Sequence, residues 1–322
     1  MNMNETSSFT KWEWIKNVFR FTYTLPFVLA SLTGVFTALV YTSQIIIGIF
    51  IVLDVFVLAL FVNLSNDYFD HKSGADSTRF FSRDKEFERG AREILSSKIY
   101  WSGNAFDLGY ITESQGKILM SVLAGSAILL SIPIIIYGGL IVILLGLIAF
   151  FLSYFYTAPP LNLGSRGLGE LDVFLSFFMI SFFSFFIITG FFSYDAFFIA
   201  LSVGFLVMNM RIVDEMSGYE THIDAGERDL CVRLGLENAS KLVVLIMVLV
   251  FFISAVIVTL SSILYLLVFL SIPFSYQIAR TLFNKNDRFR YVRAAPLAFK
   301  LSFSFQLLII IASIAQIFAT SG

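Results

Sequence analysis

Long apolar segments separated by polar connections dominate the chain. A membrane-spanning helix needs about 20 mainly apolar residues, and nine segments have this length and character. They lie near residues 22–42, 44–66, 117–136, 138–157, 171–192, 196–213, 241–260, 262–281 and 296–319. The pattern therefore predicts an all-α polytopic membrane protein with nine transmembrane helices, which form a single membrane-embedded domain over residues 1–322.

The connections between these segments alternate in length and charge. Those after odd-numbered segments hold only two or three residues, whereas those after even-numbered segments are long and charged, chiefly 67–116, 158–170, 209–240 and 282–295. None of the 22 Lys and Arg residues falls in a short connection or in the C-terminal tail. Because cationic short loops stay in the cytosol, we predict a plasma-membrane protein with a cytosolic polar cap, a C-terminus outside and a cytosolic amphipathic N-terminal segment, residues 1–20.

Composition narrows the function classes. Hydrophobic residues make up 57% of the chain and charged residues 14%, against about 25% charged residues in soluble domains. The net charge of -1 argues against a nucleic-acid partner, and the single cysteine, Cys231, excludes an internal disulfide. We expect the 38 Phe and 13 Tyr residues to lie in the bilayer or around an apolar ligand.

Polar residues cluster at the end of the second apolar segment. Asn63, Asn66, Asp67 and Asp70 fall within an arc of about 100° on a helix. Acidic side chains at membrane depth are costly unless they are paired or bind a metal, and their hard oxygen atoms suit Mg²⁺. The arrangement predicts a Mg²⁺ site at the mouth of an apolar interior; the alternative is a helix end capped by solvated acids.

Two other charged features have simpler interpretations. Asp54 lies about 140° around the same helix from Asp67, so we interpret it as a paired structural acid or as a residue near the outer surface. The mixed charges of residues 72–98 are typical of a solvated helix face. Only Lys72 and Arg79 lie close enough to the acidic cluster to be candidates for binding an anion there.

Three stretches of the chain resemble one protein family. Asn63 to Asp76 has the pattern N-x-x-N-D-Y-x-D-x-x-x-G-x-D, which resembles the first aspartate motif of the UbiA superfamily of intramembrane prenyltransferases. It is most similar to the motif of the 1,4-dihydroxy-2-naphthoate polyprenyltransferases. Residues 102–113 and the two short motifs of 156–170 resemble segments of the same family. The resemblance implies nine spans around a central apolar cavity and Mg²⁺-dependent transfer of a polyprenyl group from an isoprenyl diphosphate to an aromatic acceptor, in menaquinone biosynthesis.

The family's second aspartate motif, often D-x-x-x-D or longer, is only partly matched after the sixth segment. Asp214 fits it, but Gly218 and His222 stand four and eight residues later. Glu215, Glu220 and Asp224 therefore compete with Asp214 to complete the site. His222 is a candidate base, a candidate metal ligand in place of an acid, or a solvated loop histidine, which we favour.

The helical arc and the resemblance together predict the site residues. Three acids are the first candidates for metal ligands: Asp67, Asp70 and Asp214. Four more acids are alternative metal or catalytic residues: Asp76, Glu215, Glu220 and Asp224. Seven residues are candidates for contact with the diphosphate or substrate: Asn63, Asn66, Lys72, Arg79, Asn209, Arg211 and Tyr156.

Alternative functions remain open from the sequence. The same fold could prenylate another small lipid acceptor, such as a glycerol-phosphate ether in archaeal lipid synthesis, or a tetrapyrrole. The degenerate second motif is also compatible with a member of weakened catalysis. A membrane transporter could use the acids as ion sites, but transporters place such sites near the bilayer midplane, and these acids lie at the segment ends. The predicted partners are thus an isoprenyl diphosphate, a small acceptor and membrane lipid.

Overall fold

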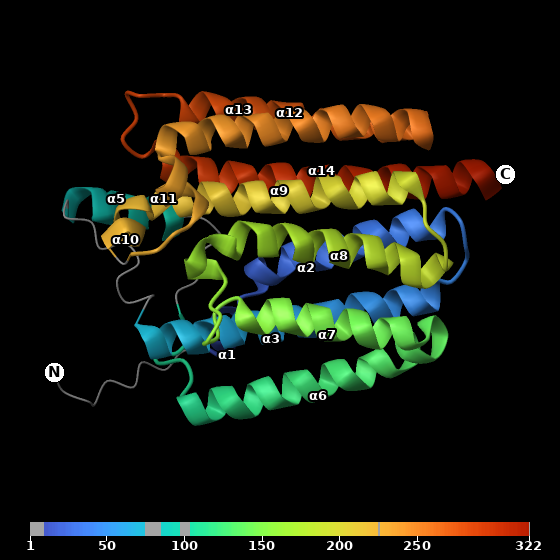
Figure 1. The fold of residues 1–322 in the computed structure, drawn as a ribbon, viewed down its shortest axis with the longest axis horizontal. Coiled ribbons are helices and arrows are strands. Elements are labelled where there is room, and N and C mark those ends of the chain that lie inside the picture. The colour runs from blue at the N-terminus through green and yellow to red at the C-terminus, as the bar shows by residue number, and fades with distance from the viewer. Residues whose placement is uncertain (1–9, 75–84, 97–103, 225, 322) are drawn as a thin grey trace.

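The computed structural model describes residues 10–74, 85–96, 104–224 and 226–321, in which all regular structure is helical. Long helices run side by side along one axis (Figure 1). They are α2 (Phe21–Leu39), α3 (Ile45–Ser73), α6 (Glu113–Gly138), α7 (Leu140–Phe155), α8 (Gly169–Thr189), α9 (Tyr194–Ser217), α12 (Leu236–Leu260), α13 (Ile272–Leu282) with the preceding 3₁₀ helix η2 (Ile263–Ser271), and α14 (Arg290–Ser321).

Each predicted apolar segment corresponds to one of these helices. Within the described residues, eight helical segments are long and apolar enough to cross a membrane. The remaining one, α7, is apolar but has only 16 residues, so its span stays a prediction. The all-α polytopic membrane fold is confirmed.

Short helical elements gather at one end of the bundle, here called the polar end. They include α5 (Lys85–Ser96), α10 (Tyr219–Asp224) and α11 (Leu230–Leu234) (Figure 1). The helix α1 (Lys11–Phe19) precedes α2, and a π-helical turn, η1 (Gly164–Leu168), leads into α8. The helix α14 ends at the opposite end of the bundle.

The helices α2, α8 and α9 form the centre of the fold, and small residues let them approach closely. A Cβ atom on Gly34 of α2 would overlap the carbonyl oxygen of Ser181 in α8. A Cβ atom on Gly204 of α9 would lie 2.9 Å from the carbonyl oxygen of Phe174, also in α8. Such contacts are characteristic of membrane helices, which gain stability by close backbone packing.

Two acids with buried carboxylate oxygen atoms lie away from the polar end. Asp195, in the first turn of α9, accepts a hydrogen bond of 2.7 Å from the Tyr41 hydroxyl group and so ties the α2–α3 connection to α9. Asp54, near the middle of α3, has a buried Oδ1 atom without a hydrogen-bond partner in the described part of the chain. The interpretation of Asp54 as a paired acid is therefore wrong.

Candidate active site

A cavity of about 430 Å³ opens between the helices near the polar end. Its walls come from α2, α3, α8, α9 and α14 and from the connections that follow α7 and α9. Acids and cations line it close to the helix ends. One or two turns deeper the lining becomes apolar, with Phe27, Phe177, Val207, Met210 and Phe299. The cavity therefore combines a charged mouth with an apolar interior.

The first acidic cluster divides into two parts in the structure. Asn63, Asn66 and Asp70 follow an i, i+3, i+7 stripe on α3 and line the cavity. The Thr157 hydroxyl group donates a 2.8 Å hydrogen bond to Asn66 Oδ1, and Asn63 Nδ2 donates one of 3.0 Å to Thr24 Oγ1. These contacts fix the two amides at the cavity wall.

Asp67 does not line the cavity, contrary to expectation. Its carboxylate is fully buried, pairs with Arg20 and accepts a 3.0 Å hydrogen bond from the Ala105 amide. Its carbonyl oxygen accepts a 2.7 Å hydrogen bond from Asn104 Nδ2. The reason is geometric: Asp67 lies beside the stripe of Asp70, on the flank of α3 that faces residues 104–105.

Asp67 instead positions a cation that the sequence analysis missed. Arg20, between α1 and α2, lines the cavity and is held by Asp67 and by the ring of Tyr23, whose centroid lies 4.1 Å from the guanidinium carbon. In the sequence, Arg20 is one of several basic residues near the N-terminus and indicates only topology. Its partner is 47 positions away.

The helix α9 supplies a second polar wall. Asp214, Arg211 and Glu215 all line the cavity, and Arg211 pairs with Glu215 one turn away. The Arg211 guanidinium also lies over the Tyr156 ring, 5.7 Å from its centroid. Asp70 of α3 and Asp214 of α9 therefore reach one cavity from two walls.

Asn209 lies deeper on α9 and is not among the cavity-lining residues. Its side chain is buried, and neither amide atom has a hydrogen-bond partner among the described residues. The predicted contact of Asn209 with substrate stays a prediction.

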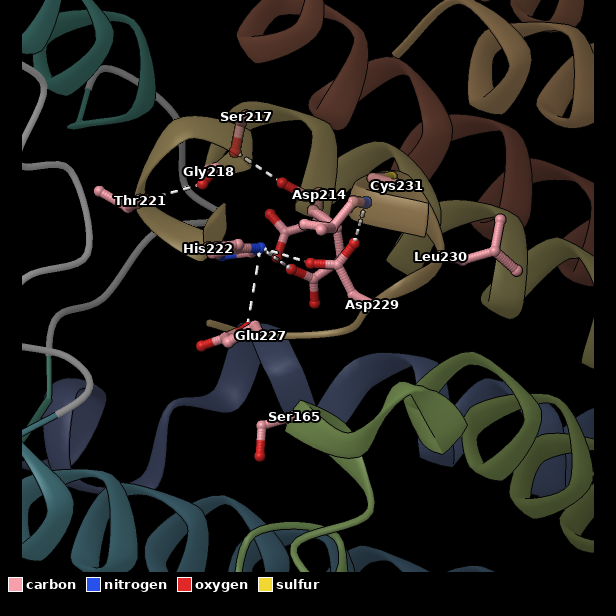
Figure 2. Close-up of polar contacts among 12 residues, drawn as sticks. Ser165, Asp214, Ser217, Gly218, Thr221, His222, Glu227, Asp229, Leu230 and Cys231 are labelled. Atoms are coloured by element: carbon pink, nitrogen blue, oxygen red, sulfur yellow. Dashed lines mark hydrogen bonds and ion pairs between the residues drawn. The ribbon is translucent and has the colours of Figure 1, made fainter. Parts of the chain in front are cut away.

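His222 lies inside a cluster of carboxylates (Figure 2). Its Nδ1 atom is 2.8 Å from Asp229 Oδ2, 2.9 Å from Glu215 Oε2 and 3.8 Å from Glu227 Oε2. Burial lowers the pKa of His222, but the hydrogen bonds to Asp229 and Glu215 outweigh it and raise the pKa to about 10. The side chain is 14% exposed, so the interpretation as a solvated loop histidine is wrong.

The charge of His222 also limits its chemistry. A protonated imidazole has donors on both nitrogen atoms and offers no lone pair to a metal or to a substrate proton. The ligand atoms of Glu215, His222, Glu227 and Asp229 lie within 4.8 Å of one another, close enough to hold a cation. At neutral pH the imidazolium itself is the cation that these acids surround.

Gly218 and His222 fit one another. A Cβ atom on Gly218 would lie 2.7 Å from His222 Nε2, so a side chain at position 218 would displace the ring. Figure 2 shows the two residues in adjacent turns of the same segment. At the two positions that depart from the acidic second motif, the lack of a side chain at Gly218 therefore leaves room for the ring of His222.

The segment that carries His222 docks onto the connection after α7. The Arg228 amide donates to the Ser165 carbonyl oxygen at 3.1 Å, and Arg233 Nη2 donates to the Gly167 carbonyl oxygen at 2.9 Å. Gly167 has φ = 82°, and a Cβ atom there would overlap the Arg228 carbonyl oxygen. These contacts join the two segments at the mouth of the cavity.

Comparisons with known proteins place the chain in a family. The model of the UbiA prenyltransferase family matches residues 108–304, more than half of the chain. The chain belongs to the UbiA prenyltransferase family. Family membership makes it an enzyme of prenyl transfer and agrees with the resemblance noted in the sequence. No curated protein matches the chain by sequence.

Solved structures of UbiA homologues share the fold. A UbiA homologue from Archaeoglobus fulgidus bound to GPP and Mg²⁺ has a TM-score of 0.63 at 15% identity, over 94% of this chain and 99% of that chain. A UbiA homologue from Archaeoglobus fulgidus bound to Cd²⁺ has a TM-score of 0.60 at 15% identity, over 94% of this chain and 98% of that chain. A digeranylgeranylglyceryl phosphate synthase has a TM-score of 0.62 at 14% identity, over 94% of this chain and 99% of that chain. At these identities the likeness concerns the UbiA fold alone.

Three other predicted site residues of this UbiA chain do not line the cavity: Lys72, Glu220 and Asp224. Lys72 pairs with Glu113 at 2.7 Å and lies over the ring of Tyr68. Glu220 and Asp224 lie on the exposed surface of α10. Asp76 and Arg79 fall outside the described residues.

Cavity residues that the sequence analysis missed include two acids. Glu227 lies in a charged connection between helices, where acids are usually solvated. Asp172 lies in the first turn of α8 with Glu170, where acids normally complement the helix dipole. Glu170 serves the local structure, since its Oε1 accepts a 2.6 Å hydrogen bond from the Leu230 amide at the start of α11. No sequence signal separates the two acids of α8.

Proposed function

We propose that this protein catalyses the Mg²⁺-dependent transfer of a polyprenyl group from an isoprenyl diphosphate to an aromatic, dihydroxynaphthoate-like acceptor in quinone biosynthesis. One observation carries the proposal: Asp70 and Asp214 reach a single cavity that has fixed cations at its mouth and an apolar interior. An isoprenyl diphosphate has the same division between a charged head and an apolar tail. Following the distribution of Lys and Arg, we place the polar end of the bundle in the cytosol.

The donor set at the mouth fits Mg²⁺. Mg²⁺ is typically bound by one or two carboxylates together with substrate phosphates, and Asp70, Asp214 and Asn66 offer only hard oxygen ligands from two walls. The A. fulgidus homologue bound to GPP or to DMAPP together with Mg²⁺ supports this assignment. When bound, the metal would neutralise charge on the diphosphate and make it a better leaving group.

Three cations of the chain complement the diphosphate. Arg20, Arg211 and His222 line the mouth, and each is fixed by a buried acid, Asp67 for Arg20 and Glu215 for the other two. Charges held in place before the reaction stabilise developing negative charge without reorganisation. They would bind the diphosphate and favour its departure.

The apolar interior suits the other half of the substrate. Phe27, Phe177 and Phe299 present aromatic side chains next to Val207 and Met210. Aromatic faces attract a carbocation by up to about 2 kcal/mol when it is desolvated, and they do not react with it. A site in the bilayer also limits the access of water to the cation. The same lining would hold the prenyl tail and an aromatic acceptor.

A second candidate is a glycerol-phosphate acceptor, favoured by the likeness to a digeranylgeranylglyceryl phosphate synthase. A phosphorylated acceptor requires a second cationic clamp, ideally an arginine fork. Three arginines of the connections are candidates for such a clamp: Arg166, Arg228 and Arg233. Arg233 donates to the Gly167 carbonyl oxygen, and Arg166 and Arg228 are exposed. The pattern of Asn63 to Asp76 supports the aromatic acceptor.

Product analysis tests the proposal. Purified protein with Mg²⁺ and labelled prenyl diphosphates of several lengths is offered dihydroxynaphthoate, other phenolic acids and glycerol-phosphate ethers, and products are identified by mass spectrometry. We expect a C-prenylated aromatic product that is lost when Mg²⁺ is chelated. Preferential formation of an ether-linked prenyl glycerol phosphate would refute the aromatic acceptor, and turnover of no acceptor by folded protein would refute the proposed function.

A further inference from the structure

One acid in the cavity wall has no hydrogen-bond or ionic partner among the described residues. Asp172 of α8 lines the cavity, is 6% exposed, and has a fully buried Oδ1 atom without a hydrogen bond. Within the described part of the chain, the other cavity acids, Asp70, Asp214, Glu215 and Glu227, all have polar or ionic partners. Asp172 makes no such contact there.

A buried carboxylate without a partner is costly. Leaving a buried acceptor unsatisfied costs about 1–3 kcal/mol, and more for a charged group. A ligand that offers a donor to Asp172 recovers this free energy. Asp54 shows that the lack of a partner does not by itself make a site, because Asp54 also has an unsatisfied Oδ1 but does not line the cavity. Asp172 both has an unsatisfied carboxylate oxygen among the described residues and lines the cavity.

The surroundings of Asp172 select the kind of ligand. The three cations of the mouth are each held by another acid, Asp67 for Arg20 and Glu215 for Arg211 and His222. A phosphate or carboxylate next to Asp172 would meet a like charge, and no cavity-lining cation among the described residues remains to compensate it, because the proposed function assigns these three cations to the diphosphate. A neutral hydroxyl group would instead donate to it. Ser176, one turn along α8, and the Tyr156 ring line the same cavity and are compatible with a flat, hydroxylated ligand.

We propose that Asp172 binds a hydroxyl group of the acceptor and accepts its proton during prenyl transfer. This inference rests on the proposed function. The C1–O bond of the prenyl diphosphate breaks, and its electron pair leaves with the diphosphate. The ring carbon next to the hydroxyl group donates an electron pair to C1 and forms the new C–C bond, while the O–H electron pair becomes the C=O π bond and the proton moves to Asp172.

The ring then regains its aromaticity. The attacked carbon loses its hydrogen as a proton to the released diphosphate, and the C–H electron pair returns to the ring. The carbonyl oxygen takes back the proton from Asp172, which is restored as a carboxylate. The sum is one prenyl group transferred and one proton and one diphosphate released. Asp172 is thus assigned to the acceptor, and the cations of the mouth are assigned to the diphosphate.

The variant Asp172→Asn separates these two roles. Two reactions are measured with Mg²⁺ and a labelled prenyl diphosphate: release of diphosphate by hydrolysis without an acceptor, and transfer to a hydroxylated aromatic acceptor. Because ionisation does not need the base, we expect hydrolysis within about twofold of the unmodified protein. General base catalysis contributes about 100-fold or more, so kcat for transfer should fall by at least about 100-fold.

A second measurement distinguishes the loss of a proton acceptor from a change in the shape of the site in the Asp172→Asn variant. An acceptor analogue whose hydroxyl group is made more acidic by ring halogens needs less help from a base, so the Asp172→Asn variant should lose less activity with it than with the parent acceptor. An equal loss with both acceptors would overturn the role of base.

Asp54→Asn is the matched control. It also neutralises an acid with a buried carboxylate oxygen that has no hydrogen-bond partner among the described residues, but away from the cavity, so both reactions should proceed at the unmodified rates. Normal transfer by Asp172→Asn would overturn the inference and leave the proposed function standing. Loss of hydrolysis together with transfer would overturn it too, because Asp172 would then serve the diphosphate. If the unmodified protein hydrolyses prenyl diphosphate but prenylates no acceptor, the proposed function itself fails.

Discussion

Asp67 and Asp70 are three residues apart in one motif, and the structure assigns them different tasks. Asp67 is fully buried and pairs with Arg20, whose side chain is 11% exposed. Asp67→Asn keeps the shape but leaves the guanidinium without its counter-ion, and removing one partner of a buried pair costs about 3–5 kcal/mol. The Ala105 amide, 3.0 Å from Oδ2, also loses its acceptor if the Asn amide nitrogen takes that place. We expect Asp67→Asn to lower the free energy of unfolding by about 3–5 kcal/mol.

Asp70→Asn is the contrasting variant. Asp70 faces the cavity, so its substitution should leave stability nearly unchanged and lower kcat/KM for prenyl transfer about 100-fold, or about 2.7 kcal/mol of transition-state stabilisation. Unfolding is followed in detergent by denaturant titration, and activity is measured on the folded fraction.

A double-mutant cycle checks that the loss comes from the pair. Adding Arg20→Gln to Asp67→Asn removes the orphaned charge, so the double variant should be more stable than the sum of the single losses predicts. If Asp67→Asn unfolds like the unmodified protein, or if the two losses simply add, the ion pair does not stabilise the fold and the reasoning fails.

Three further predictions concern the polar end. The contribution of His222 is the difference in free energy of unfolding between the unmodified protein and the His222→Gln variant, measured at several pH values. Because the pKa of His222 is raised from 6.5 to about 10, this difference should be fully present below pH 6.5 and should be lost as pH rises through about 10. Gly167→Ala should loosen the docked segment and increase the rate of its proteolysis, because the Cβ atom of the new alanine would overlap the Arg228 carbonyl oxygen. Gly226→Ala is the control, since Gly226 has a similar φ but no atom within 4 Å of its Cβ position, and it should increase proteolysis much less. Equal effects of the two substitutions would contradict the steric argument. Cys231 is buried, and burial raises the pKa of its thiol, so it should react with thiol reagents only after unfolding, whichever face of the membrane is exposed.

The spans could be predicted from the sequence because the signal is local. Apolar length alone identifies α3 or α12, and the polar stripe of Asn63, Asn66 and Asp70 follows from helical periodicity. The same periodicity was misleading for Asp67, whose orientation depends on Arg20, 47 residues earlier. Contacts of that kind arise from tertiary packing and leave no periodic trace.

His222 and Asp172 illustrate the two ways in which local patterns fail. The charge of His222 depends on Glu215, Glu227 and Asp229, which the fold brings around the ring from α9 and from the following connection. Asp172 differs from His222, because it is notable for having no hydrogen-bond partner among the described residues. A sequence shows which acids are present but not which of them are left unpaired.

If α7 crosses the bilayer as the sequence predicts, its short length has a mechanical consequence for the surrounding lipid. Its 16 residues span about 24 Å at 1.5 Å per residue, less than the hydrocarbon thickness of about 30 Å. The neighbouring α6 has 26 residues, so acyl chains beside this pair meet two different lengths of apolar surface. Such hydrophobic mismatch is relieved by local thinning of the bilayer. The connection after α7, which carries Tyr156 and Thr157 into the cavity wall, would then lie where the bilayer is locally thinned. Its position relative to the rest of the site would depend on the thickness of the host membrane.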